Sequence, residues 1–578
     1  MSRLLVSAAH KSSGKTTVTV GLCAALSAQG MVVQPFKKGP DYIDPMWLAQ
    51  ASGRDCFNLD SYLMTPEQIT ACFTRHAATS DISIVEGNKG LYDGLALDGS
   101  NSNAALAHLL DLPVVLVLDA RGMTRGIAPL ILGYQAFDAR IRIAGVILNQ
   151  LGGARHESKL RAVIEHYTDV SVLGAIGHDP RLAVVERHLG LMPNHELDDA
   201  SQRVRAMGEL IGSQVDLLRV RQIAASVTPL SPQPGSMSMI QEPPEPRVRI
   251  GLARDKAFGF YYPDDLLALE QAGAELIPFD TLQDTCLPEV DGLFIGGGFP
   301  EMFMPELQAN TAMRDSIRRA VEADMPVYAE CGGLMYLART LHWKDETYDM
   351  VGAVPADVVM HERPVGRGYV VLEATSDAPW LTDIGQTLRG HEFHYSSLEN
   401  VAPDQKFAYR VKRGHGVDGQ HDGIVYRKVL ASYAHLRSGA GSEWAAQFVT
   451  FVRAQRHATK AQNFASALSV LVNGKPIATD TEGYIKNLDE WSEDFALARA
   501  KAEELELTEA HWQVIAFLRA YYEEHRVQAQ VRAMIWHFTK VWGPELGNNH
   551  HLHTLFPIGG PQKQGNRLAG LLKTKGEH

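Results

Sequence analysis

The chain has 578 residues, 45% of them hydrophobic and 21% charged, and its formal net charge is -12. This length exceeds what one hydrophobic core supports, so we expect three or more domains. The acidic balance argues against a protein that coats nucleic acid, and no apolar run approaches the about 18 residues of a membrane-spanning helix.

The chain starts with Met1-Ser2-Arg3 and enters a predicted strand at once, without the pattern of a secretory signal. We therefore expect a cytoplasmic protein without a membrane partner. Its five cysteines lie at irregular spacing and form no CxxC pair. That arrangement indicates reduced thiols rather than a disulfide framework or a zinc site.

Short β-branched segments alternate with helical stretches over residues 1–225. This rhythm predicts an α/β domain with a parallel, doubly wound sheet. The expected strands are 4–8, 32–36, 82–85, 114–119, 143–149 and 172–176. Residues 226–247 are rich in proline and serine and show no periodicity, so we expect a linker there.

The first predicted strand is followed by a candidate phosphate loop, Ser13-Gly14-Lys15-Thr16-Thr17. Although the first glycine of the usual pattern is absent, the loop lies at a strand-to-helix junction, where backbone amides can hold phosphate oxygens. Lys15 would neutralise the phosphates of ATP, and the Thr16 hydroxyl would bind Mg²⁺. A glycine–lysine turn without function is the alternative, which the parallel-sheet context disfavours.

Two acidic segments, 39–45 and 85–94, also follow predicted strands. Ligands of such sheets bind at the carboxyl ends of the strands, so both segments should face the phosphates. Glu86, with Asp41 or Asp44, would complete the oxygen ligands of a metal ion. The candidate phosphate and substrate residues are Lys38, Asp41, Tyr42, Asp44 and Asp93. Asp119 and Asn149 also end strands, and helix capping explains them almost as well.

A second α/β domain is expected over residues 248–455, with Cys331 on a tight strand-to-helix turn. This context predicts a thiol nucleophile of the class I glutaminase type, with His435 as its base. The amides of Gly297, Gly298 and Gly332 would stabilise the oxyanion. Relatives often carry an acid two residues after the histidine, where this chain has Arg437, so the sequence does not predict a complete triad. A buried structural role is the alternative for His435.

Eight motifs occur in order over residues 1–455: SSGKTT, FKKGPDYIDP, VEGNKGLYDG, ARDKAFGFYYPDDL, FIGGGFPE, AECGGLMYL, GHEFHYS and SYAHL. In this order they resemble the cobyrinic acid a,c-diamide synthase family. The resemblance implies an ATP domain similar to dethiobiotin synthetase and a Cys–His glutaminase without the usual third acid. It also implies that ATP phosphorylates a tetrapyrrole acetate and that ammonia from glutamine then displaces the phosphate. His391 and His394 suggest a metal site, but the resemblance favours tetrapyrrole contact or a structural role.

A polar stretch, 456–463, is expected to link to a third, mainly helical domain, 464–578. Apolar residues at helical spacing run through 514–521 and 531–538. Motifs such as Val472-Asn473-Gly474-Lys475-Pro476 resemble the DsrC/TusE family of sulfur-relay proteins, whose members carry sulfur on cysteines of a C-terminal arm. Here those positions are Asn566 and Glu577, and no cysteine follows Cys331. Sulfur transfer by this domain is therefore excluded, and docking to dissimilatory sulfite reductase remains.

The resemblances together favour amidation of sirohaem, because a stand-alone relative of the first two domains occurs with dissimilatory sulfite reductases and is proposed to amidate that group. Cobyrinic acid, in cobalamin synthesis, is the alternative tetrapyrrole substrate. A different class of function is DNA binding through a helix-turn-helix in the third domain, which the acidic chain disfavours. The oligomeric state is left open, with a homodimer among the options.

Overall fold

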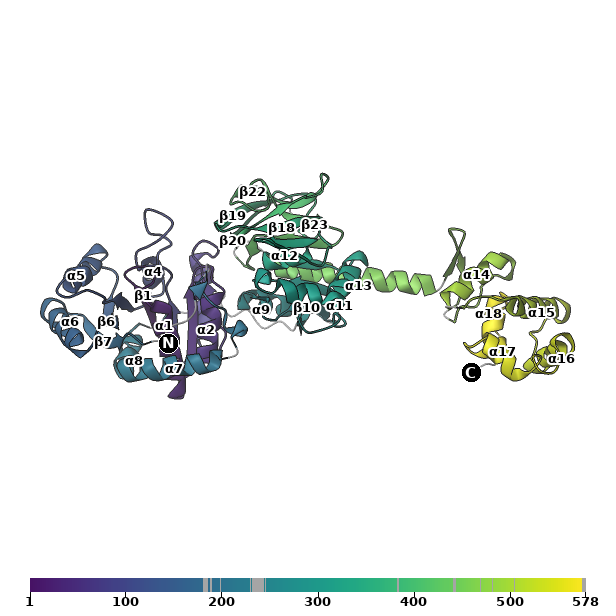
Figure 1. Ribbon diagram of the computed structural model, residues 1–578, viewed down its shortest axis with the longest axis horizontal. Coiled ribbons are helices and arrows are strands. Elements are labelled where there is room, and N and C mark those ends of the chain that lie inside the picture. The colour runs from purple at the N-terminus through teal and green to yellow at the C-terminus, as the bar shows by residue number, and fades with distance from the viewer. Residues whose placement is uncertain are drawn as a thin grey trace. The chain divides into compact units, whose positions relative to one another are not determined.

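The computed structural model describes residues 1–179, 186–187, 190–197, 199–228, 230, 244, 246–381, 384–439, 443–467, 469–480, 482–503 and 505–573. The chain forms two compact units, Met1–Arg453 and Ala454–His578 (Figure 1). The first unit contains an ATP half, residues 1–225, and a glutaminase half, residues 248–453. In the described part of the chain, no helix has the length and apolar character needed to cross a bilayer.

The ATP half is built on a seven-stranded parallel sheet in the order β3-β2-β4-β1-β5-β6-β7. Its strands are β1 (Ser2–Ala8), β2 (Val33–Lys38), β3 (Phe57–Leu59), β4 (Ile82–Glu86), β5 (Val114–Asp119), β6 (Ile143–Leu151) and β7 (Ser171–Gly177). All six predicted strands are confirmed. The short strand β3 was not predicted, because three residues show no periodicity.

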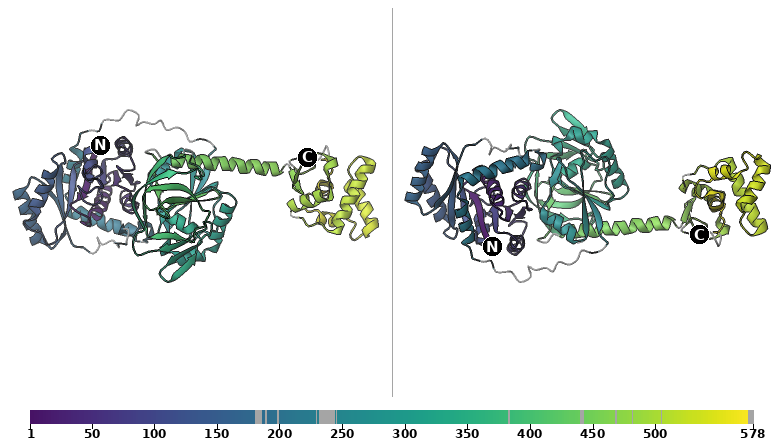
Figure 2. Two further views of the ribbon diagram at one scale, coloured as in Figure 1. Left: turned by 90° about the horizontal axis from the view of Figure 1, so that it is seen from above. Right: turned by 90° about the horizontal axis from the view of Figure 1, so that it is seen from below.

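Helices cover both faces of this sheet, as the two views in Figure 2 show. They are α1 (Lys15–Ala28), α2 (Ile43–Ser52), α3 (Pro66–Ala77), α4 (Asn103–Leu109), α5 (Ile127–Phe137), α6 (Ala154–Tyr167), α7 (Ala200–Gln214) and α8 (Leu217–Ala225). Helices α1, α2, α7 and α8 share one apolar core, and α3 to α6 share the other. Leu4 and Val6 of β1 enter the first core and Leu5 enters the second, as side-chain alternation along a strand requires.

The glutaminase half contains a ten-stranded sheet in the order β12-β10-β13-β15-β24-β23-β22-β19-β20-β25. Its strands are β10 (Val248–Ala253), β12 (Ala274–Phe279), β13 (Gly292–Ile295), β15 (Val327–Glu330), β19 (Gly366–Ala374), β20 (Thr387–His394), β22 (Lys406–Arg413), β23 (His421–Tyr426), β24 (Val429–Ser432) and β25 (His435–Leu436). Pairing is parallel from β12 to β24 and antiparallel from there onward.

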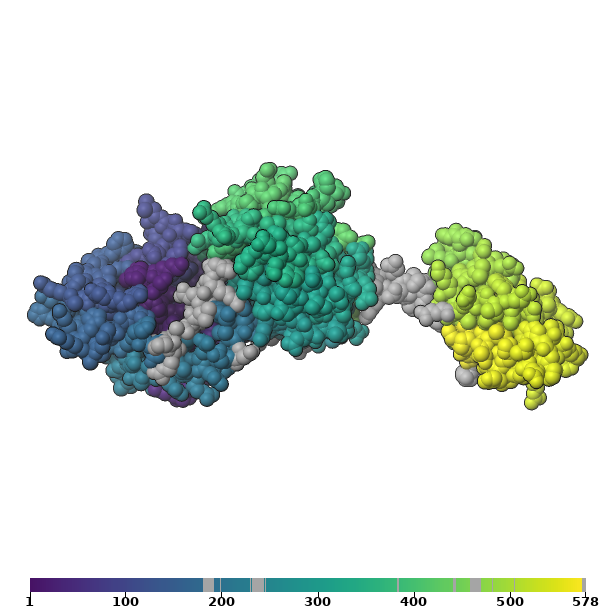
Figure 3. Space-filling view, viewed as in Figure 1, coloured from purple at the N-terminus to yellow at the C-terminus, as the bar shows by residue number. Residues whose placement is uncertain are grey.

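Smaller elements complete the glutaminase half. Its helices are α9 (Pro263–Gln271), α10 (Met304–Ala309), α11 (Thr311–Glu322) and α12 (Gly332–Leu337). Strands β11 (Phe258–Phe260) and β14 (Gly297–Gly298) pair beside the large sheet, and β16 (Thr340–Trp343), β17 (Glu346–Asp349), β18 (Asp357–Met360) and β21 (Ser396–Glu399) form a further sheet. Figure 3 shows the two halves as closely packed surfaces, purple to blue for the ATP half and teal to green for the glutaminase half.

The second unit begins inside helix α13 (Trp444–Ala467), which contains the whole predicted linker 456–463. It continues with β26 (Ser469–Val472), β27 (Lys475–Ala478), α14 (Glu493–Ala502), α15 (Glu509–His525), α16 (Val531–Trp542), α17 (Asn549–Leu555) and α18 (Asn566–Leu568). Both helices predicted from apolar spacing are present. The β26–β27 hairpin was missed, although its Asn473-Gly474 turn, with positive φ at both residues, has a recognisable sequence signature.

Candidate active sites

The phosphate loop joins β1 to α1 and has a geometry that depends on glycine. Gly14 adopts φ 82°, and a Cβ there would lie 2.1 Å from Asn149 Nδ2. Asn149 donates from that nitrogen to the carbonyl of Ser13 at 2.9 Å, while the Ser13 hydroxyl donates to the His10 carbonyl at 2.9 Å. Asn149, for which the sequence left two roles open, therefore braces the loop from the end of β6.

A cluster of charged side chains lies directly after the loop. Lys15 Nζ and Thr16 Oγ1 donate to Glu86 Oε1 at 3.0 and 2.6 Å, and Thr16 Oγ1 also contacts Asp44 Oδ2 at 3.3 Å. Lys37 Nζ lies 3.0 Å from Glu86 Oε1 and pairs with Asp44 as well. The structure thus brings together the predicted residues Lys15, Thr16, Asp44 and Glu86.

Lys37 is the member of this cluster that sequence reasoning missed as a site residue. It is buried at the carboxyl end of β2, and its ammonium also lies 3.7 Å from Asp41 Oδ2. Burial acts to lower the pKa of Lys37, but Asp44, Glu86 and Asp41 outweigh this effect and raise it well above its ordinary value. Lys37 is therefore a fixed cation beside the phosphate loop, and its position at a strand end was the signal that could have identified it.

The oxygen atoms of this cluster fit the preference of Mg²⁺. Glu86 Oε2 is buried and has no hydrogen-bond partner among the described residues, while the Thr16 hydroxyl donates to Glu86 Oε1 and also lies 3.3 Å from Asp44 Oδ2. A hard cation takes carboxylate and hydroxyl oxygens of this kind. Thr16, Glu86 and Asp44 therefore have suitable ligand atoms. Asp41, predicted as a ligand, instead accepts from the amides of Ile43 and Asp44 through Oδ1 and reaches the cluster through Lys37.

The remaining candidates of the ATP half lie in different surroundings. Asp93 accepts from the amide of Gly90 at 2.9 Å and so shapes its own loop, while Asp119 pairs with the exposed Arg121. Lys38 is buried, and this burial lowers its pKa against the opposing effect of Asp60. Phosphate binding by Lys38, Asp93 and Thr17 stays a prediction, because the contacts of the described residues do not bear on it.

Tyr42 lies at the contact between the two halves of the first unit. Its ring centroid is 5.4 Å from that of Phe260, 4.5 Å from Tyr262, 5.6 Å from His391 and 5.2 Å from His435. The neighbouring Asp41 and Asp44 belong to the phosphate cluster, but the Tyr42 ring faces the glutaminase histidines. The structure therefore gives this residue surroundings different from those of the phosphate site predicted for it.

Cys331 occupies the predicted elbow between β15 and α12. It adopts φ 47° and ψ -100°, a conformation that costs a non-glycine residue about 1–3 kcal/mol and that exposes a nucleophile at a sharp turn. A Cβ on Gly332 would lie 2.9 Å from the amide nitrogen of Gly298, and one on Gly297 would lie 2.8 Å from His435 Cε1. The three predicted oxyanion glycines thus surround Cys331 and His435, although their role itself stays a prediction.

An acidic side chain does lie against His435, although the sequence did not predict a third member of a triad. Glu330 Oε2 lies 3.2 Å from His435 Nδ1, and both side chains are buried. Glu330 Oε1 accepts from the Tyr328 hydroxyl at 2.7 Å and from the amide of Leu436 at 3.0 Å, which fixes the carboxylate. The acid comes from the residue before Cys331, not from the position two residues after His435.

The electrostatics of this group favour a charged imidazolium. Burial acts to lower the pKa of His435, but hydrogen bonds with Cys331 and Glu330 outweigh it and raise the pKa to about 10. This arrangement is suited to Cys331 as a nucleophile, His435 as its base and Glu330 as an orienting acid, and these roles stay predictions.

The other histidines of this half do not form the suggested metal site. His391 and His394 project from opposite faces of β20. The His391 ring lies against His435, with ring centroids 4.9 Å apart, and His394 forms a hydrogen bond with the Ser396 carbonyl. Burial, with His435 and Arg437 nearby, holds the pKa of His391 well below its usual range, so this ring is neutral. Its Nδ1 lies 3.3 Å from the Tyr262 hydroxyl.

Arg437 has a structural role at the contact of the two halves. Its guanidinium donates to the Asn58 carbonyl of the ATP half at 2.6 Å and pairs with Asp264 of the glutaminase half. Asp264 also lies near Cys72 and His76, with ligand atoms within 4.8 Å of one another. Because Arg437 neutralises the Asp264 carboxylate, we interpret Cys72, His76 and Asp264 as part of the contact between the two halves.

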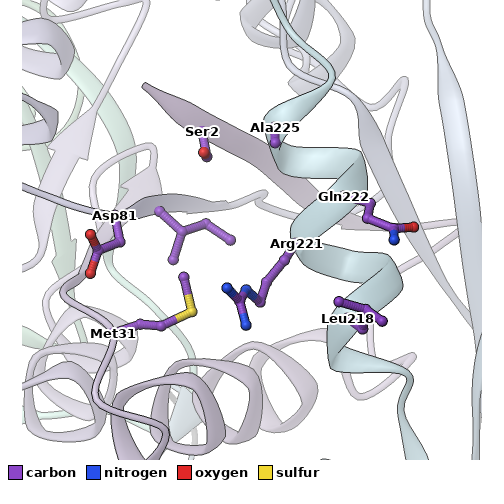
Figure 4. A pocket seen from close by; sticks show the side chains of 8 residues that line it. Ser2, Met31, Asp81, Leu218, Arg221, Gln222 and Ala225 are labelled. Carbon is purple, nitrogen blue, oxygen red and sulfur yellow. The ribbon is translucent and has the colours of Figure 1, made fainter.

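A surface pocket lies away from both sites. It is lined by Ser2, Met31, Asp81, Ile82, Leu218, Arg221, Gln222 and Ala225 (Figure 4). Ser2 and Ile82 begin β1 and β4, so the pocket opens at the amino ends of the strands. Ligands of parallel sheets bind at the carboxyl ends, where Lys15, Lys37 and Glu86 lie. The pocket is therefore separate from the phosphate site.

Comparisons with known proteins agree with this geometry. Family models match an AAA domain over residues 2–185, a CobB/CobQ-like glutamine amidotransferase domain over 249–441 and a DsrC like protein over 471–576. The cobyrinate a,c-diamide synthase of Magnetococcus marinus is 47% identical over 455 residues, which cover 78% of this chain and 97% of that protein. The synthase of Methanosarcina barkeri is 43% identical over 476 residues and is covered to 96%.

The solved DsrC of Allochromatium vinosum is 45% identical, covers 19% of this chain and 97% of its own, and gives a TM-score of 0.18. The DsrC likeness is confined to the second unit, whereas the synthase relatives are matched over nearly their whole length. The chain therefore belongs to the cobyrinate a,c-diamide synthase family of glutamine-dependent amidoligases, and it carries a DsrC-like C-terminal domain in addition.

Proposed function

We propose that this protein uses ATP and glutamine to amidate acetate side chains of a tetrapyrrole, and that sirohaem destined for dissimilatory sulfite reductase is its substrate. The observation that carries the reaction is the pair of sites in one compact unit: the cluster of Lys15, Lys37 and Glu86, and the triad of Cys331, His435 and Glu330. A carboxylate does not react with ammonia at neutral pH, so both sites are needed.

In the first half-reaction, the Cys331 thiolate attacks the side-chain carbonyl carbon of glutamine. His435 donates its proton to the amide nitrogen, which leaves as ammonia, and the glycine amides stabilise the negative oxygen. Water, activated by the now neutral His435, then hydrolyses the thioester to release glutamate. Glu330 keeps the imidazole ring oriented through both steps.

In the second half-reaction, an acetate oxygen of the tetrapyrrole attacks the γ-phosphorus of ATP and ADP leaves. Lys15 and Lys37 neutralise the phosphate oxygens, and Mg²⁺ held by Thr16, Glu86 and Asp44 would supply further charge neutralisation. Ammonia attacks the acyl carbon of the resulting acyl phosphate, and inorganic phosphate leaves as the amide forms. Each amidation therefore consumes one ATP and one glutamine.

The choice of sirohaem rests on the C-terminal domain. The domain matches the DsrC family but lacks cysteines at the two sulfur-carrying positions of the arm. Asn566, which is buried, occupies one of these positions, and Glu577, outside the described residues, occupies the other. The described part of the arm packs on its own domain: Trp491 donates to the Leu568 carbonyl and Arg519 to the Ala569 carbonyl, both at 2.8 Å. A domain that keeps this fold without a thiol is suited to docking on a sulfite reductase.

The test compares the two tetrapyrroles directly. Purified protein is incubated with ATP, Mg²⁺ and glutamine together with sirohaem or cobyrinic acid, and amide formation is followed by mass spectrometry. We expect sirohaem to be amidated on acetate side chains with the higher kcat/KM. Turnover of cobyrinic acid alone would reject the sirohaem assignment, and turnover of neither would reject tetrapyrrole amidation.

A further inference from the structure

Two arginines of the glutaminase half lie over one tyrosine of the ATP half. The guanidinium carbons of Arg389 and Arg413 lie 5.5 and 5.4 Å from the ring centroid of Tyr62. Arg389 Nη1 also contacts the Tyr62 carbonyl at 3.3 Å, and Arg413 Nη1 contacts the Tyr62 hydroxyl at 3.4 Å. Two like charges are therefore held beside a single ring.

The sheet explains why these side chains converge. Val371 of β19 is paired with Arg389 of β20 on one side and with Arg413 of β22 on the other. Residues paired across antiparallel strands point to the same face of a sheet. Both arginine side chains therefore project from the same face of the sheet as Tyr369. The Tyr369 ring stacks on Tyr62 with centroids 4.2 Å apart.

Neither arginine has an acidic partner within the described ranges of the chain. Both are exposed, and no carboxylate of those residues forms a salt bridge with them, in contrast to Arg339, which pairs with Asp357, and Arg427, which pairs with Glu322. Two adjacent guanidinium groups repel each other, and an arriving anion relieves that repulsion. Arginine also presents a planar fork that matches a carboxylate.

The tyrosine itself is rigidly held near the phosphate site. Asp60 accepts from the amides of Tyr62 and Leu63 and from the Tyr369 hydroxyl, which fixes both rings. Tyr62 follows the carboxyl end of β3, and in the sheet β3 lies next to β2, which lies next to β4 with Glu86 at its end. At the usual strand spacing, the carboxyl ends of β3 and β4 lie about 10 Å apart, and Tyr62 follows the end of β3 within three residues.

We propose that Tyr62, Arg389 and Arg413 form a subsite for the peripheral carboxylates of the tetrapyrrole substrate. The arginines bind carboxylates that are not being amidated, and the ring of Tyr62 gives the macrocycle a flat surface. A second carboxylate on the same rim then reaches the phosphate cluster at the carboxyl ends of β2 and β4. This inference rests on the proposed function, because it names where the substrate of that reaction binds.

Equilibrium binding without ATP tests the subsite separately from turnover. Cobyrinic acid is titrated into the full-length protein and followed by its visible absorption, and sirohaem is titrated in the same way. Because a charge-assisted hydrogen bond is lost, Arg389→Gln and Arg413→Gln should each raise Kd about ten-fold, and the double variant about a hundred-fold. Arg413→Lys, which keeps the charge, should bind more tightly than Arg413→Gln.

The controls separate this subsite from general charge effects and from misfolding. Lys406→Gln removes a positive charge from the same strand β22, but Lys406 already pairs with Asp377 at 3.2 Å, so Kd should not change. Basal hydrolysis of glutamine should stay unchanged in Lys406→Gln, and a cooperative melting transition shows that the arginine variants are folded. The affinity of the unmodified protein should fall with added salt more steeply than that of the double variant.

The outcomes distinguish the subsite from the proposed function. A double variant that binds both macrocycles as tightly as the unmodified protein would overturn the subsite and leave the proposed function standing. An unmodified protein that binds neither macrocycle would overturn both. Weaker binding of only one of the two macrocycles would support the subsite and identify that macrocycle as the one it fits.

Discussion

Replacing Glu330 by glutamine tests whether this acid orients His435, the predicted base. The substitution keeps the shape of the side chain, and its Oε1 still accepts from Tyr328 and from the amide of Leu436. What changes is the atom that faces His435 Nδ1 at 3.2 Å, where a carboxylate oxygen is replaced by an amide. The fold should therefore persist while the histidine loses its anionic partner.

The size of the effect follows from that one contact. A hydrogen bond to a charged group contributes about 1.5–3 kcal/mol, which corresponds to about one to two pKa units. The pKa of His435, raised to about 10 in the intact site, should fall by this amount in Glu330→Gln. An amide that donates to Nδ1 also imposes the wrong tautomer, so we expect kcat/KM for glutamine hydrolysis to fall by about 10³- to 10⁴-fold.

The assay measures glutamate release across a pH series, with ammonia-dependent amidation as the control. In the unmodified protein activity should decline only as the pH rises through about 10, where His435 loses its proton, and in the variant this alkaline limb should shift to lower pH. Ammonia-dependent amidation should be unaffected. Unchanged glutamine hydrolysis with an unmoved alkaline limb would refute the role of Glu330.

The contact between Glu330 and His435 should also affect the stability of the folded protein. The pKa of His435 is higher in the folded protein than the unfolded value of about 6.5, so its contribution is complete below about pH 6.5 and is lost as the pH rises through about 10. The gap in melting temperature between the unmodified protein and Glu330→Gln should therefore be wider at pH 6 than at pH 10. A gap that is constant over this range would contradict the ion pair.

Three further variants test the separate parts of the chain. Cys331→Ser should abolish glutamine-dependent amidation and retain the ammonia-dependent reaction, and loss of both reactions would contradict separate sites. Lys15→Ala should lower amidation with either nitrogen source by about 10²- to 10³-fold, because it removes a phosphate-binding charge, whereas normal Mg²⁺-ATP binding and turnover would reject the phosphate loop. Deletion of residues 464–578 should leave amidation of free tetrapyrrole intact and weaken binding to dissimilatory sulfite reductase in a pull-down, and equal binding by both forms would reject docking.

The sequence predicted the parts of the protein whose signals are local. The six long strands of the ATP half, the elbow at Cys331 and the helices α15 and α16 all follow from periodicity or from a short motif. Lys15, Thr16, Asp44 and Glu86 could be grouped in advance, because the carboxyl ends of parallel strands meet at one edge of a sheet. Each of these predictions needs only the chain itself and one rule of topology.

The missed residues depend on contacts between distant segments. Glu330 was within the motif that identified Cys331, but its role appears only when β15 and β25 bring it to His435. Arg389 and Arg413 became conspicuous only after antiparallel pairing placed both beside Val371. Tyr42 was predicted as a substrate or phosphate residue, and no pattern in the sequence shows that its ring turns toward the other half of the unit.

The replacement of an acid by Arg437 affects how variants of this enzyme should be interpreted. His435 and Arg437 lie on the same three-residue segment, and Arg437 is bonded to the backbone of Asn58 in the ATP half. A substitution near Asn58 that leaves every nucleotide contact in place can therefore displace His435 and lower glutaminase activity. In a random mutagenesis screen, some of the substitutions that lower glutaminase activity should therefore lie in the ATP half.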